Sequence, residues 1–223
     1  MRTTRKNQTQ TAKTDPAETR HQVLEKLKAA TTGKIQPPRP DFAGSFYHTS
    51  PLPPVELFCK NLEEVKGVAR RVKNEEELLG ALQTLIASRG WKTLACPESE
   101  LRKKLSRLKP ESVSDLPGQV EVAITGCEYL VAGLGAAVVS SAQAGSRQLF
   151  VFPPVHLILA RQSQLVETLD EAYQLLIGKY GNNLPSLITT ITGPSRTADI
   201  EKTLILGAHG PQELYVFISE TNF

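Results

Sequence analysis

The chain has 223 residues, of which 40% are hydrophobic and 22% are charged, a composition typical of a soluble globular protein with one domain of ordinary to large size. Its formal net charge is only +3, a balance that does not favour a nucleic-acid-binding protein. The cysteines Cys59, Cys96 and Cys127 lie far apart, so neither an iron–sulfur cluster, a zinc or other metal site, nor a disulfide framework is expected in this chain.

No apolar segment follows Met1, as a secretory signal would require. The longest apolar stretch, residues 130–139, contains two glycines and is too short to span a bilayer. These features predict a cytoplasmic protein without a membrane segment.

Residues 1–54 have the composition of a basic N-terminal arm. Residues 1–40 hold nine Lys or Arg against three acidic side chains. Residues 1–14 have almost nothing apolar to bury, which predicts disorder there. The six prolines between residues 37 and 54 predict an extended linker or wrapping arm. We therefore expect two parts, a partly disordered arm over residues 1–54 and a folded domain over residues 55–223.

One short helix is expected inside the arm. Asp15 is a suitable N-cap, because Pro16 occupies the first helical position and Glu18 follows three residues after the cap. An apolar stripe over residues 23–27 makes this helix amphipathic. It is expected to pack on its own domain or on a second copy of the chain. The alternative is that it binds a membrane surface or another partner.

From residue 55 onward, helical and strand patterns alternate. Asn74 is a suitable N-cap, and the three glutamates after it favour the positive end of a helix. The alternation predicts an α/β fold in which helices flank a sheet. The expected helices cover residues 55–66, 74–88 and 97–108, and the expected strands cover residues 68–72, 91–95 and 119–124.

The middle of the chain is expected to add further strands. Residues 127–132 suit a short helix, residues 165–176 an amphipathic helix, and residues 136–140, 148–152 and 155–160 suit strands. Gly133 and Gly135 resemble part of a dinucleotide-binding loop, but the third glycine of that pattern is missing. His156 lies within an apolar strand, where a hydrogen-bonded core histidine is more common than a catalytic one.

A polar cluster near the C-terminus supplies the candidate site. Residues 187–192 favour a strand, which Gly193 and Pro194 end. Open α/β sheets usually bind ligands where strands end, so we expect a site here. A second loop, with a histidine between glycines, precedes the strand expected at residues 214–218. The candidate ligand-binding residues are Ser195, Arg196, Thr197, Asp199, Glu201, His209 and Gly210.

Each of these side chains has a chemical use. Arg196 is a forked cation that suits a carboxylate, Ser195 and Thr197 offer hydroxyls and helix caps, and the two acids suit a helix N-terminus. His209 is the candidate proton acceptor, since its pKa lies near working pH. The alternative is that the glycine–proline pairs are only turns and that Arg196 forms an ion pair with Asp199 or Glu201.

The same stretch resembles a known family. Gly193-Pro-Ser-Arg-Thr-Ala-Asp-Ile-Glu201, followed by Leu206-Gly-Ala-His-Gly-Pro211, is similar to the C-terminal signature of the LUD-domain family, in particular its lactate utilization protein C branch. Pro153-Pro154-Val155-His156-Leu157 is similar to a central segment of that family, and the resemblance extends from about Arg39 to the end. One departure is that Ala132-Gly133-Leu134-Gly135-Ala136 replaces the Ala-Glu-Thr-Gly-Thr of many members.

The resemblance implies a Rossmann-like, three-layer α/β fold related to the NagB, ribose-phosphate isomerase and CoA-transferase group. It also implies membership of a system that oxidises L-lactate to pyruvate alongside iron–sulfur partner proteins. Since no cysteine cluster is expected here, the chain would be a subunit that carries no cofactor of its own and that binds a small carboxylate or assembles with those partners. A homo-oligomer is also possible.

Two other functions are considered beside this one. The first is an independent enzyme with the chemistry of CoA transferases or formyltetrahydrofolate cyclo-ligase, acting on a phosphorylated or nucleotide-bearing substrate. It would need an acid–base carboxylate in its cleft, and the departure at Gly133 removes the likeliest one. The second is a DNA-associated protein that works through the basic arm, which lacks interleaved aromatic residues and ranks last.

Overall fold

A computed structural model describes residues 15–30, 50–108, 112–113, 117–143, 147–198, 204–206 and 209–223. The chain divides into two units, Met1–Phe46 and Tyr47–Phe223. In the first unit the described part is helix α1 (Pro16–Ala30). It begins where the sequence predicts, and Asp15 Oδ1 accepts the Ala17 N–H at 3.0 Å. Its apolar side chains Val23, Leu24 and Leu27 are exposed.

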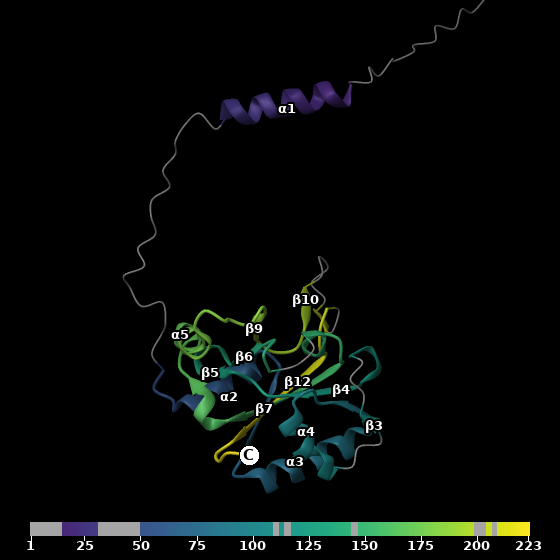
Figure 1. Ribbon diagram of the computed structural model, residues 1–223, viewed down its shortest axis with the longest axis vertical. Coiled ribbons are helices and arrows are strands. Elements are labelled where there is room, and N and C mark those ends of the chain that lie inside the picture. The colour runs from purple at the N-terminus through teal and green to yellow at the C-terminus, as the bar shows by residue number, and fades with distance from the viewer. Residues whose placement is uncertain are drawn as a thin grey trace, which may run out of the picture. The chain divides into compact units, whose positions relative to one another are not determined.

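The second unit is built around a six-stranded sheet in which every neighbouring pair is parallel (Figure 1). Its central strands read as continuous apolar runs because both faces of the sheet are covered. In spatial order the strands are β1 (Val68–Val72), β12 (Glu213–Ser219), β7 (Val155–Arg161), β4 (Val122–Thr125), β2 (Thr93–Ala95) and β3 (Ser112–Val113).

Helices α3 (Glu75–Arg89) and α4 (Ser99–Leu105) cover one face of this sheet (Figure 1). Helix α3 begins as predicted, because Asn74 Oδ1 accepts the Glu77 N–H at 3.0 Å. The helix ends at Gly90, which adopts the left-handed conformation that suits glycine. Leu82 of α3 and Phe217 of β12 are fully buried between the helices and the sheet.

The opposite face packs against helix α2 (Pro54–Glu64) and a second sheet that the sequence analysis did not predict. Phe58 and Leu62 of α2 are buried in this layer. Helix α5 (Leu169–Tyr180) packs on the second sheet through Ala172 and Leu176. The strands of the second sheet, in spatial order, are β8 (Leu165–Val166), β5 (Tyr129–Val131), β6 (Ala136–Ser140) and β9 (Ile188–Ile191).

The predicted α/β class, a sheet with flanking helices, is confirmed, and the structure shows that the central sheet is parallel. Three local predictions are wrong. Residues 129–131 form strand β5 where a helix was expected, residues 147–150 form a 3-10 helix where a strand was expected, and α5 begins at Leu169 after the short strand β8. None of the described helices is long and apolar enough to cross a membrane.

Candidate functional site

The order of the strands creates a crevice at one edge of the central sheet. From β2 the chain passes outward to β3, then returns to β4 on the other side of β2. Connections that leave neighbouring parallel strands in opposite directions open a crevice at their carboxyl ends, and α/β proteins commonly bind ligands there. The topology therefore predicts a ligand site at the carboxyl ends of β2, β4 and β7.

A pocket of about 150 Å³ lies at this edge. Its lining residues come from segments that follow the strands, so the fold brings them together from distant parts of the sequence. They include Glu98 after β2, Gly126 and Cys127 after β4, Arg161 and Gln164 at and after the end of β7, and Phe223 after β12.

Two acidic side chains, Glu98 and Glu100, line this pocket, and Glu98 is the more buried of them. Its Oε1 accepts the backbone N–H of Gly126 at 2.6 Å. Burial raises the pKa of Glu98; the Gly126 hydrogen bond opposes this effect, and the negative charge of Glu128 adds to it, so the pKa lies above its usual value. A partly buried carboxyl with a raised pKa is a typical proton donor or acceptor.

Arg161 supplies positive charge to the pocket. Its guanidinium lies 5.9 Å from the ring centroid of Phe223. In the described part of the chain, no carboxylate lies within ion-pair distance of Arg161. Lys104 also lines the pocket, but it forms an ion pair of 2.6 Å with Glu75. Arg161 is therefore the better placed of the two to contact an anion.

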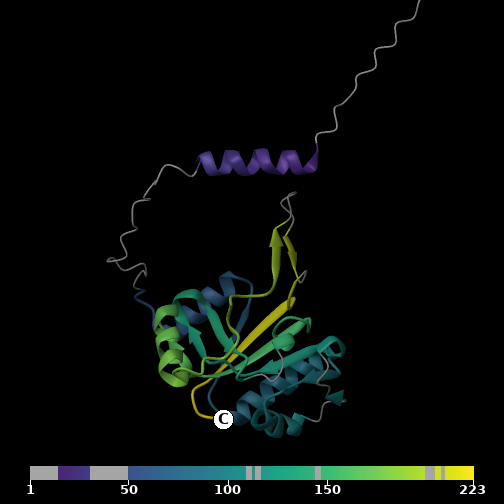
Figure 2. The same cartoon turned by 45° about the horizontal axis from the view of Figure 1, so that its top comes forward.

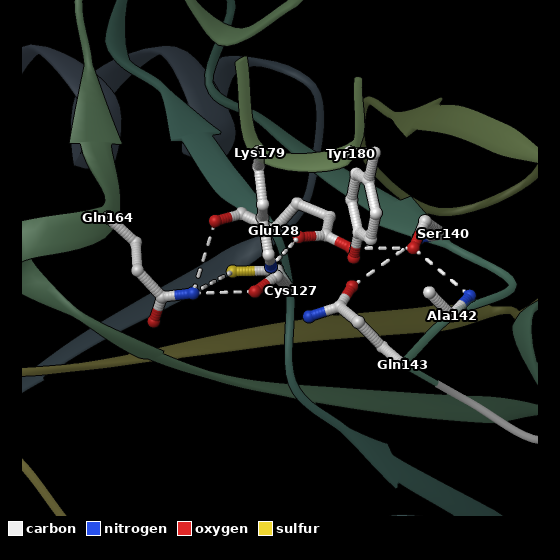
Figure 3. A network of polar contacts seen from close by, with 8 residues as sticks. All are labelled: Cys127, Glu128, Ser140, Ala142, Gln143, Gln164, Lys179 and Tyr180. Carbon is white, nitrogen blue, oxygen red and sulfur yellow. Dashed lines mark hydrogen bonds and ion pairs between the residues drawn. The ribbon is translucent and has the colours of Figure 1, made fainter. Parts of the chain in front are cut away.

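Gln164 fixes the side of the pocket next to Arg161. Its Oε1 accepts the backbone N–H of Arg161 at 2.9 Å. Its Nε2 donates to the backbone oxygens of Cys127 at 2.5 Å and Glu128 at 3.2 Å (Figure 3). One amide thus ties the end of β7 to the segment after β4.

The residue after Cys127 is a buried carboxylate, Glu128, which is 4% exposed. Its Oε1 accepts the hydroxyls of Ser140 at 2.5 Å and Tyr180 at 2.7 Å, and its Oε2 pairs with Lys179 Nζ at 2.7 Å (Figure 3). Burial raises the pKa of Glu128, but the hydrogen bonds from Lys179, Ser140 and Tyr180 outweigh it and hold the pKa below its usual value. This network anchors α5 to the second sheet and does not line the pocket.

Cys127 lines the pocket but is not a reactive thiol. Burial raises the pKa of its thiol well above the ordinary value, and the negative charges of Glu98 and Glu128 add to that effect. A thiol that stays protonated is a poor nucleophile and a poor metal ligand. In the described ranges, no group of three or more His, Cys, Asp or Glu side chains is arranged to hold a metal ion.

His156 is a buried core residue, the reading that the sequence favours. Its Nε2 lies 2.9 Å from Thr125 Oγ1. Thr125 donates its own hydroxyl proton to the Gly126 carbonyl, so its oxygen accepts the Nε2–H and Nδ1 carries the lone pair. Nδ1 is buried without a hydrogen-bond partner. Burial lowers the pKa of His156 to about 4, and the side chain is neutral at working pH.

We expect His156 to make the protein less stable in mild acid. The unfolded chain binds a proton at His156 with a pKa near 6.5, and the folded chain does so only near 4. Between these values the unfolded state holds more protons, so stability falls as the pH decreases. The expected loss from pH 7 to pH 5 is about 2 kcal/mol. Urea denaturation of the wild type and of His156→Gln at both pH values measures it. An equal pH dependence in the two proteins would contradict this account.

The structure places the predicted C-terminal cluster elsewhere. The Ser195 N–H donates to the Pro211 oxygen at 2.8 Å, and a Cβ added to Gly210 would lie 3.0 Å from Ser195 Cβ, so the two predicted loops lie side by side. The loop that contains Gly210 leads directly into β12, so both loops lie at the amino ends of the central strands, called here the amino edge. Figure 2 shows the hairpin next to them and the C-terminus at opposite ends of the second unit.

In the described residues after Ser195, the backbone is a strand where a helix start was expected. Strand β10 (Arg196–Ala198) pairs antiparallel with β11 (Leu204–Leu206). Arg196 and His209 are exposed, and in the described residues no hydrogen bond or ion pair joins them. Asp199 and Glu201 lie outside the described residues. The ligand-binding role of this cluster stays a prediction.

The segment that departs from the family pattern packs against α2. The Asn61 Nδ2 donates to the oxygens of Ala132 at 2.9 Å and Gly133 at 3.1 Å. A Cβ on Gly133 would lie 3.0 Å from the Glu167 oxygen. Neither Gly133 nor Leu134 lines the pocket at the carboxyl ends of β2, β4 and β7, called here the carboxyl-edge pocket.

Glu98, Arg161 and Gln164 were not among the site residues predicted from the sequence. A usable signal existed for two of them, because Glu98 follows an expected strand and Arg161 is the first charged residue after the apolar run 155–160. Residues in such positions meet at the carboxyl edge of a parallel sheet. No signal marked Gln164, whose role depends on how the segments pack.

Comparisons with known proteins give the family. The sequence model of the LUD domain matches residues 94–219. Lactate utilization protein C from Halalkalibacterium halodurans is 32% identical over 105 residues, which are 46% of each chain. The protein of the same name from Bacillus subtilis is 32% identical over 105 residues, 46% of this chain and 44% of that protein. An uncharacterized protein from Escherichia coli, YkgG, is 34% identical over 104 residues, 46% of this chain and 45% of that protein.

These alignments span less than half the length of each relative. A crystal structure of a DUF162 family protein from Deinococcus radiodurans has a TM-score of 0.57 and 19% identity, covering 76% of this chain and 99% of that one. At this identity the likeness shows a shared α/β fold. Because the LUD domain model matches more than half of the chain, and the segment includes both edges described above, the chain belongs to the LUD domain family.

Proposed function

We propose that this chain is a LUD-domain subunit, without an iron–sulfur cluster of its own, of a system that oxidises L-lactate to pyruvate. In this proposal it binds a small carboxylate and works beside iron–sulfur partner proteins that take the electrons. The observation that carries the proposal is the similarity of its LUD segment to proteins named lactate utilization protein C. The scattered cysteines, of which Cys127 has a thiol that stays protonated, support it.

The alternative of an independent enzyme gains one observation from the structure. Glu98 is a partly buried carboxyl in a pocket, which acid–base chemistry on a phosphorylated or nucleotide-bearing substrate would require. The pocket volume of about 150 Å³ does not favour a phosphorylated or nucleotide-bearing substrate, because sites for larger organic ligands usually measure about 300–1,000 Å³. A small acid is the better match.

A thermal-shift titration of the full chain tests the proposal. A ligand that binds only the native state raises the melting temperature, and at ten times its Kd it adds about 1.4 kcal/mol of stability. We expect L-lactate or pyruvate to raise the melting temperature. Nucleotides, CoA and sugar phosphates are the comparison set, and a rise with these alone would favour the independent enzyme. No rise with any of them would contradict carboxylate binding by this chain.

Two places offer an arginine for that carboxylate. One is the amino-edge cluster, with Ser195, Arg196, Thr197, Asp199, Glu201, His209 and Gly210 as the predicted ligand-binding residues. The other is the carboxyl-edge pocket with Arg161. A variant of each arginine in the same titration distinguishes the two.

A further inference from the structure

We infer that the pocket at the carboxyl ends of β2, β4 and β7 binds a three-carbon acid with an oxygen on its second carbon, with Arg161 on the carboxylate and Glu98 on that oxygen. The inference rests on the proposed function for the identity of the acid. The residues and the position come from the geometry of the pocket.

The size of the pocket sets the size of the ligand. The pocket measures about 150 Å³, whereas sites for larger organic ligands usually measure about 300–1,000 Å³. A molecule of about six non-hydrogen atoms, such as lactate or pyruvate, matches that space. Sugar phosphates and nucleotides do not.

Arg161 is the cation of this pocket that can bind the carboxylate of an acid. Lys104 is neutralised by Glu75 at 2.6 Å, and Glu100 is neutralised by Lys103 at 2.7 Å. Arg161 has no carboxylate partner in the described part of the chain and is held beside the Phe223 ring. A guanidinium presents two parallel N–H groups to a carboxylate, which gives both affinity and orientation.

Glu98 distinguishes between acids of the same size. Its Oε1 is used by the Gly126 N–H, and its Oε2 has no hydrogen-bond donor in the described residues. An ionised Oε2 accepts a hydrogen bond from a 2-hydroxyl, so lactate gains a hydrogen bond that propionate cannot make. A site built for a hydroxyl discriminates strongly against an analogue without one.

Gly126 keeps the carboxyl in place. A Cβ at this position would lie 2.9 Å from Glu98 Oε2, so a side chain would push the carboxyl out of its hydrogen bond. Gln164 holds the next residue, Cys127, by its backbone oxygen. The Glu98 carboxyl is thus held by a backbone N–H just after β4, and Gln164 ties the backbone of Arg161 to the same segment.

Two-dimensional ¹H–¹⁵N NMR of the full chain, titrated with L-lactate, pyruvate and propionate, tests the inference. We expect L-lactate to move the Gly126 amide and the Arg161 Nε–H resonances and to bind more tightly than propionate. Arg161→Ala should weaken L-lactate binding at least about tenfold, since it removes hydrogen bonds to a charged group. Arg161→Lys keeps the positive charge but not the two parallel N–H groups, so it should weaken L-lactate binding less. Arg71→Ala, an exposed arginine of β1, is the matched control.

Glu98→Gln tests the second contact. Its amide oxygen can keep the Gly126 N–H, and its NH₂ group then faces the ligand as a donor. The variant should therefore lose preference for the hydroxyl of lactate and gain preference for the keto oxygen of pyruvate. We expect the ratio of the two affinities to fall about tenfold.

The outcomes separate the inference from the proposed function. Shifts confined to the amides of Ser195 and Gly210, lost in Arg196→Ala, would leave carboxylate binding intact and overturn the pocket as its site. Wild-type affinity in Arg161→Ala, or an unchanged lactate-to-pyruvate ratio in Glu98→Gln, would overturn the assigned contacts. No shift with L-lactate or pyruvate anywhere would overturn both.

Discussion

Replacing Gly135 with alanine is expected to lower the free energy of unfolding by more than about 4 kcal/mol, or to prevent folding. Gly135 has a φ of 59°, a left-handed conformation that costs other residues energy. A Cβ there would also lie 2.2 Å from the Leu62 nitrogen and 2.5 Å from the Asn61 carbonyl carbon. Both are backbone atoms of α2, whose Phe58 and Leu62 are buried in the core. The helix cannot retreat without opening that layer.

Two other glycines separate the causes of this effect. Gly90 has a φ of 70° with nothing within 4 Å of an added Cβ, so Gly90→Ala measures the conformational cost alone, about 1–2 kcal/mol. Gly80 lies within α3 and also has open space, so Gly80→Ala should stabilise the protein by up to about 1 kcal/mol. Urea denaturation followed by circular dichroism compares all three. If Gly135→Ala costs no more than Gly90→Ala, close packing against α2 is not the reason for the glycine.

The parts of the fold that depend on local chemistry were predictable. Asn74 caps α3 where the sequence places it, and the apolar run at residues 155–160 becomes the buried strand β7. Alternation of helix and strand predicted a sheet flanked by helices, and the central sheet has helices on both faces. In these segments the signal lies within a few residues of the element that it forms.

The second sheet was not predictable in this way. Strand β5 has only three residues and lies in an apolar stretch that is buried on both faces, so neither the helical nor the strand period is visible. Its pairing with β8 joins Leu130 to Leu165, far along the sequence. Only tertiary packing decides that these residues form strands.

The candidate site was missed for a related reason. The predicted site follows residues 187–192, most of which form β9, because ligands often bind where strands end. That strand belongs to the second sheet and pairs with β6, so the loop after it leads to the amino edge of the central sheet. The rule applies to β2, β4 and β7, whose neighbours in the sheet depend on long-range pairing. Glu98 and Arg161 lie at the carboxyl ends of these strands.

Replacing Glu128 with alanine is the second substitution with a large expected effect. The change leaves the hydroxyls of Ser140 and Tyr180 without their acceptor and opens space inside a fully packed region. An unsatisfied buried polar group costs about 1–3 kcal/mol. Lys179 is about half exposed, so its ammonium can return to water and adds little to the cost. We expect a loss of about 3 kcal/mol in the free energy of unfolding.

Glu128→Gln is the matched control, because it keeps the volume of the side chain and one acceptor oxygen. It should cost less than the alanine variant, since its amide oxygen can replace Oε1, which accepts both hydroxyls, and no space is opened. The low pKa of Glu128 predicts a further difference: in the wild type its contribution is present above the unfolded pKa and is lost as the pH falls through the folded value. Urea denaturation at pH 7 and at pH 4 should therefore bring wild type and Glu128→Gln closer together in acid. An alanine variant as stable as the glutamine variant at pH 7 would mean that the network is not needed to hold α5 on the second sheet.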